Sequence, residues 1–222
     1  MRLQIRDTIQ IARHEEEIDH ALEAFLTSKI HSLHRNISLP QENTSRSLLD
    51  FVTRYIEHVP DVIDALRGMT QASGTYSFAR EFLDVAESYF SSPPDFISQK
   101  HSGMQALIDQ AYLAHRLIEE VNDRMMIVWG MPLAPMDMTI SNLIIHDILG
   151  EDLANELDTA VAYSVEVLFT KLDFANTLIF QRHVDLHREK GFKSELEQWP
   201  CLAGDSSIFL VMNEGSVKPT LH

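Results

Sequence analysis

The chain has 222 residues, of which 45% are hydrophobic and 23% charged, and its 33 acidic and 18 basic side chains give a formal net charge of −15. This usage is typical of a globular domain, and the acidic excess argues against a nucleic-acid partner, because binding a phosphate backbone needs a patch of lysine and arginine. A single cysteine, Cys201, excludes an intrachain disulfide, and the lack of a long uncharged apolar stretch or a signal-peptide segment predicts a soluble, cytoplasmic protein with no membrane span.

Two long helices are predicted in the first third of the chain. The first covers residues 3–38 and ends before Pro40; its apolar residues recur every three or four positions and so share one face. The second begins at Thr44, a typical N-cap residue, and continues to Gly74 with the same spacing. Pro60 interrupts this second segment, which predicts either a kink or two consecutive helices.

The remainder of the chain is also predicted to be helical. Two shorter helices cover residues 76–90 and 137–149, and two long ones cover residues 102–129 and 151–190. On the 102–129 helix, apolar residues again recur at three-and-four spacing. The apolar rows of all these segments are assigned to a common core, in which methionine and aromatic side chains fill space.

These elements predict an all-α fold. The expected architecture is a bundle of about four long and two short helices, in a single domain over residues 1–200. Period-two alternation occurs at residues 207–212 and predicts one short strand or an extended segment. Residues 201–222 are therefore assigned to a C-terminal extended tail.

Histidine is frequent, with 11 residues in the chain, and imidazole serves as a metal ligand and as a general base. Glu17 and His20 form the chain's only Glu-x-x-His, a spacing that lets two side chains of one helical turn meet a single cation, as in ferritin-like di-iron bundles. Such bundles use a second copy of this motif, which this chain lacks. The alternative is a solvated row at the edge of the buried face.

Other helices also carry histidine at ligand spacing. His115 and Glu119 are four residues apart, close enough to share a metal or a proton, and His183 and His187 repeat that spacing. His183 continues the apolar row of its helix, and for it a histidine packed in the core or at an interface is the alternative. The candidate ligands of a divalent or transition metal are His115, Glu119, His146, Asp147, Glu17 and His20.

Residues 143–150, an apolar helix that ends in His146-Asp147 and is followed by glycine, resemble the central signature of the HD metal-dependent phosphohydrolases. His115 lies at the place of that family's first histidine ligand. The resemblance implies that these three residues hold a divalent cation that activates water. The downstream aspartate of the signature is Asp158 or Asp173.

A second segment, the His-Arg-Glu-Lys-Gly at residues 187–191, is similar to the His-x-x-Lys-Gly of histidine phosphotransfer domains. That resemblance implies a helical histidine that accepts a phosphoryl group. By contrast, the chain has no P-loop, no dinucleotide-binding glycine motif and no Gly-x-Ser-x-Gly, so the chemistry of those folds is not indicated.

Two functions follow from these patterns. The first is a metal- or cofactor-binding helical bundle, with metal-dependent hydrolysis or oxidation through histidine and carboxylate ligands as its activity. The alternative is a non-catalytic regulatory protein, whose acidic faces and long apolar rows dock a helical partner or a second copy of the chain. The sequence does not indicate a particular small-molecule ligand.

Overall fold

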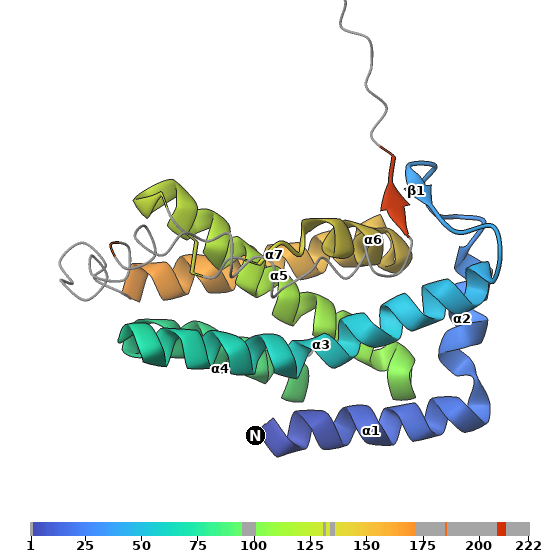
Figure 1. Cartoon of the computed structure of the whole chain (residues 1–222), viewed down its shortest axis with the longest axis horizontal. Coiled ribbons are helices and arrows are strands. Elements are labelled where there is room, and N and C mark those ends of the chain that lie inside the picture. The colour runs from blue at the N-terminus through green and yellow to red at the C-terminus, as the bar shows by residue number, and fades with distance from the viewer. Residues whose placement is uncertain are drawn as a thin grey trace, which may run out of the picture.

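The computed structural model describes residues 2–94, 101–130, 132–133, 136–171, 185 and 208–211, and this part of the chain forms seven helices and two short strands (Figure 1). The helices are α1 (Arg2–Asp19), α2 (Ala21–Lys29), α3 (Thr44–Ser73), α4 (Tyr76–Ser91), α5 (Gly103–Trp129), α6 (Thr139–Leu149) and α7 (Glu151–Lys171). The strands are β1 (Ile37–Ser38) and β2 (Phe209–Leu210). The predicted all-α class is confirmed.

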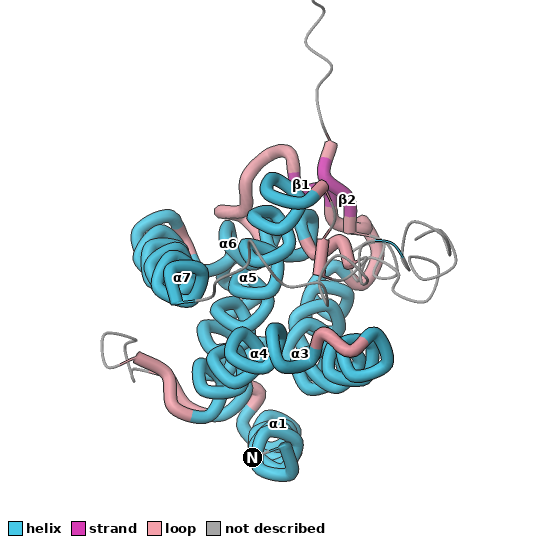
Figure 2. The backbone as a smooth tube through the Cα atoms, turned by 90° about the vertical axis from the view of Figure 1, so that its left-hand side faces the viewer, coloured by secondary structure: helices cyan, strands magenta, loops and turns pink. Residues whose placement is uncertain are grey.

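α5 is the central helix of the bundle (Figure 2). It contacts each of the other six described helices, with α3 and α4 on one side and α6 and α7 on the other (Figure 1). Residues 111–115, more than one full turn of α5, are all buried. Over these residues α5 has no solvent face, so a polar side chain there must find its partners inside the protein.

The predicted continuous helix over residues 3–38 is wrong, because the chain turns between α1 and α2. His20 has a φ of 53°, in the left-handed region that ends a regular helix. The carboxylate of Glu16 then accepts hydrogen bonds from the backbone N–H groups of Leu22 (2.7 Å) and Glu23 (2.9 Å). These are free donors of the first turn of α2, so Glu16 stabilises the new helix start where a periodic pattern shows only an exposed side chain.

The other predicted helices agree with the structure where it describes them. α3 continues through Pro60 as one helix, so the alternative of two consecutive helices is wrong. α4, α5 and α6 have almost the predicted bounds. α7 confirms the beginning of the predicted helix over 151–190; beyond Lys171 that range lies, apart from Asp185, outside the described residues.

The predicted short strand near the C-terminus is confirmed as β2. It pairs antiparallel with β1, with Ile37 opposite Leu210 and Ser38 opposite Phe209. The partner strand lies in a segment that periodicity had assigned to the first helix. The predicted domain boundary at residue 200 lies outside the described residues. None of the helices described has the length and apolar character needed to cross a bilayer.

Candidate functional site

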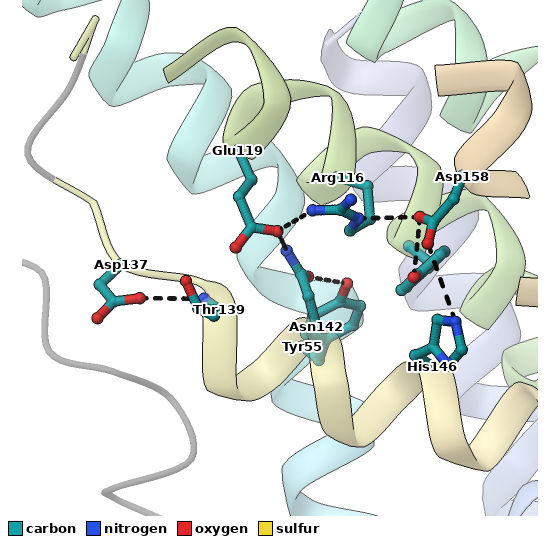
Figure 3. Close-up of polar contacts among 9 residues, drawn as sticks. Tyr55, Arg116, Glu119, Asp137, Thr139, Asn142, His146 and Asp158 are labelled. Carbon is teal, nitrogen blue, oxygen red and sulfur yellow. Dashed lines mark hydrogen bonds and ion pairs between the residues drawn. The ribbon is translucent and has the colours of Figure 1, made fainter. Parts of the chain in front are cut away.

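A pocket of about 220 Å³ lies between α5, α6 and α7, and seven of its eight lining residues have polar side chains (Figure 3). We call it the polar pocket. It is lined by Tyr112, Arg116 and Glu119 of α5, Thr139, Asn142, Leu143 and His146 of α6, and Asp158 of α7. The spaces between helices of a bundle are a common place for ligand and cofactor sites.

Helical spacing explains how these residues reach the same pocket. Arg116 lies four residues after Tyr112 and three before Glu119, so the three share one face of α5. Asn142 and His146 are four residues apart on α6 and likewise share a face. The start of α6 is set by Asp137, whose side chain accepts a hydrogen bond from the backbone N–H of Thr139 at 3.0 Å (Figure 3).

Arg116 links the two carboxylates of the pocket. Its Nε donates to Asp158 Oδ1 at 2.9 Å, and its Nη1 donates to Glu119 Oε2. Burial lowers the pKa of Arg116, but the hydrogen bonds and charges of Asp158 and Glu119 outweigh burial and raise that pKa above its ordinary value. The guanidinium therefore stays charged, and these three side chains together carry one net negative charge.

Asn142 extends this network to α3. Its Nδ2 donates to Glu119 Oε2 at 2.7 Å, and its Oδ1 accepts a hydrogen bond from the Tyr55 hydroxyl at 2.6 Å. Burial, with a further contribution from Tyr112, raises the pKa of Tyr55 well above its usual value, so the phenol stays neutral and remains a donor. The orientation of the Glu119 carboxylate is thus set by donors on two helices.

Asp158 is held in the same way. Its Oδ1 accepts from the Tyr112 hydroxyl at 3.0 Å as well as from Arg116. Burial and the Asp158 charge raise the pKa of Tyr112, which keeps this hydroxyl protonated. Asp158 Oδ2 points toward His146, whose Nε2 lies 3.9 Å away (Figure 3). Within the described ranges, no donor is hydrogen-bonded to Asp158 Oδ2 or to Glu119 Oε1.

His115 and Glu119, predicted to share a cation, face different neighbours. His115 is 0% exposed, and its Nε2–H donates to the backbone carbonyl of Tyr55 at 2.9 Å. Its ring lies 4.4 Å from that of Tyr55 and 5.8 Å from that of His58, between centroids. Glu119 instead faces the polar pocket. The structure therefore places His115 against α3, and the pair does not meet at one point.

Stability should depend on pH through His115. Burial, with a smaller effect of His58, lowers the pKa of His115 to about 3. As pH falls below about 6.5, the unfolded chain takes up a proton at this position that the folded chain binds only near pH 3, so folding is disfavoured across that window. Relative to His115→Gln, the original protein should lose up to about 1.4 kcal/mol of unfolding free energy per pH unit between pH 6 and 4.

Urea unfolding of both proteins from pH 7.5 to 4 measures this difference. His14→Gln is the matched control, because it removes a histidine from an exposed position of α1 and should keep the pH dependence that burial of His115 causes. If the free energy of unfolding changed with pH in the same way in the original protein and in His115→Gln, the lowered pKa of His115 would be contradicted.

His146 and Asp147, adjacent in the sequence, point to different places because successive helical residues are rotated by about 100°. His146 lines the polar pocket, whereas Asp147 Oδ2 accepts a hydrogen bond from the backbone N–H of His34 at 2.7 Å. Of the residues implied by the phosphohydrolase resemblance, His146 and Asp158 lie together, and His115 and Asp147 lie elsewhere. Asp173 is outside the described residues.

Glu17 and His20 are both exposed and each has a different partner. The Glu17 carboxylate lies 3.6 Å from His14 Nδ1, and His20 Nδ1 lies 3.2 Å from the Glu23 carboxylate. The left-handed turn at His20 interrupts the helix on which their spacing depends.

The remaining histidine motifs, at residues 183 and 187–191, and Cys201 are outside the described part of the chain. Among the residues that are described, no three His, Cys, Asp or Glu side chains are grouped so that they could hold a metal ion. The divalent or transition metal stays a prediction.

Arg116 and Asn142 are central to the hydrogen-bond network of the pocket, and the sequence analysis named neither as a candidate. A lone asparagine in the apolar α6 segment was the available signal, since a buried amide must be hydrogen-bonded. Arg116 gave no comparable signal, because an arginine on a long helix is usually solvated. Comparisons of the chain with protein-family models, curated proteins and solved structures gave no significant match.

Proposed function

We propose that this protein is a small-molecule-binding helical bundle, and that its polar pocket takes a protonated amine or a guanidinium group of the ligand. One observation carries the proposal. The pocket holds two carboxylates and one guanidinium, and each carboxylate has one oxygen engaged by described donors and one, Asp158 Oδ2 or Glu119 Oε1, to which no described residue donates. Such oxygens are acceptors for a cationic N–H donor.

The network around the carboxylates supports this proposal. Arg116 and Tyr112 of α5 and Asn142 of α6 hold Glu119 and Asp158 in place by hydrogen bonds. A site whose acceptors are already oriented loses less conformational freedom when a ligand binds, which favours affinity for a small molecule.

An organic cation fits the described residues better than a metal ion. His146 Nε2 and Asp158 Oδ2, 3.9 Å apart, are the only imidazole–carboxylate pair that the described residues place on this pocket. Protein sites for zinc use three or four ligands, and calcium takes six or more oxygens. Metal-dependent hydrolysis or oxidation, and the docking of a helical partner, remain predictions from the sequence.

Asp158→Asn tests the proposal directly. Titration of the protein with methylammonium or methylguanidinium chloride should give saturable NMR shift changes at Tyr112, Asn142 and His146. The substitution keeps the shape of the side chain and removes its charge, and a hydrogen bond to a charged group contributes about 1.5–3 kcal/mol. We therefore expect the dissociation constant to rise roughly 10- to 100-fold.

The matched control is Asp152→Asn, which removes the same charge from an exposed position on α7 and should leave binding unchanged. Absence of saturable binding in the original protein, or equal weakening by both substitutions, would contradict a specific site at Asp158.

A further inference from the structure

A second pocket, of about 270 Å³, adjoins the polar pocket, and we call it the apolar pocket. Its apolar lining consists of Ile37, Leu143, Leu210 and Val211. Leu143 and His146 line both pockets, so one turn of α6 forms their common wall. A molecule bound at Asp158 and extended past His146 would therefore enter the apolar pocket.

Two polar groups on the rim of the apolar pocket are hydrogen-bonded within the chain. Asp147 Oδ2 accepts from the His34 backbone N–H at 2.7 Å, and His34 Nδ1 accepts from the Asn36 backbone N–H at 3.3 Å. Most of the surface that lines this pocket is nevertheless apolar, and its apolar part is aliphatic.

The pairing of β1 with β2 builds one wall of the apolar pocket. Ile37 is directly opposite Leu210 in the register, so their side chains lie side by side on one face. Phe209, which precedes Leu210 in β2, points to the other face and is 56% exposed. The backbone N–H of Val211 also donates to the Asn36 carbonyl at 2.7 Å, which extends the pairing by one residue.

We propose that the apolar pocket holds the apolar part of the same ligand, so that the ligand class is an alkyl or arylalkyl amine. This inference rests on the proposed function. Space is sufficient, because an apolar cavity of about 150 Å³ already holds benzene. The shared wall at Leu143 and His146 joins the two pockets, and so a single molecule can place its cation at Asp158 and its hydrocarbon against Leu210.

A series of n-alkylammonium ions from methyl to hexyl, titrated calorimetrically into the full chain, tests the inference. We expect the dissociation constant to fall roughly fourfold for each methylene that enters the apolar pocket. Leu210→Ser should flatten this dependence, whereas the matched control Phe209→Ser should leave it intact. Leu143→Gln should also flatten the dependence of affinity on alkyl length. Leu143 is half exposed and lies outside the strand pair, so this variant gives a result even if Leu210→Ser disturbs the pairing of β1 with β2.

The outcomes separate the two proposals. An affinity that is constant from methyl- to hexylammonium, with methylammonium still sensitive to Asp158→Asn, would overturn the apolar-pocket inference and support the proposed function. Hexan-1-ol binding as tightly as hexylammonium would overturn the cationic assignment at Asp158, and with it the inference of one amphiphilic ligand. Failure of every ammonium ion to bind would overturn both.

Discussion

Arg116→Met should lower the free energy of unfolding at pH 7 by about 2–4 kcal/mol, because it leaves Asp158 and Glu119 facing one pocket without their shared cation. Loss of one partner of a fully buried ion pair costs about 3–5 kcal/mol. Here the three side chains are 22%, 29% and 12% exposed, and solvent screening reduces the expected cost. Chemical denaturation followed by circular dichroism measures the change.

Arg80→Met provides the comparison for Arg116→Met. Arg80 forms an ion pair with Asp84 on the surface of α4, where both side chains are about half exposed or more, and such pairs contribute about 0–1 kcal/mol. If Arg116→Met were no more destabilising than Arg80→Met, the ion pairs of Arg116 would contribute no more than an exposed surface pair, which would contradict the stabilising role assigned to its guanidinium.

Glu87→Ala should have the largest effect on stability, about 3–5 kcal/mol. Arg67 Nη2 donates to Glu87 Oε1 at 2.6 Å between α3 and α4, and the two side chains are only 9% and 4% exposed. Burial lowers the pKa of Arg67, and Glu87 more than restores it, so removing the carboxylate leaves a buried cation without its partner. Urea unfolding of the variant gives the loss directly.

The double variant Arg67→Met/Glu87→Leu distinguishes a lost pair from a lost side chain. Replacing both members of a buried ion pair by apolar residues is often neutral, so the double variant should recover most of the stability that Glu87→Ala loses. A double variant as unstable as Glu87→Ala would show that packing at these positions, and not the unpaired charge, explains the loss.

The sequence predicted helices far better than it predicted contacts. The bounds of α4, α5 and α6 follow from apolar spacing and from the glycines and prolines between segments, which are local properties of the chain. The break at His20 was missed because Glu16 caps α2 through a side chain that looks like any exposed helical glutamate. β1 was missed because two residues are too few to show alternation.

The candidate site was predicted in part. His146 was named from the phosphohydrolase resemblance and Glu119 from its spacing, and both line the polar pocket. His115 was named from its spacing to Glu119, yet it is fully buried against Tyr55. The reason is that other helices enclose this part of α5, so that the residues beside its apolar row also face protein. Asp158 was named only as one of two candidates for the downstream aspartate of the phosphohydrolase signature, and Arg116 was not named.

The amino-acid sequence by itself determined where the helices run and which residues share a face of each, because hydrogen bonding and side-chain direction in a helix repeat within four residues. Only the tertiary structure decided what each face meets. Arg116 and Asp158 are 42 residues apart and join because α5 and α7 pack together. That packing reflects apolar burial summed over the whole chain, and spacing within a single helix carries no information about it.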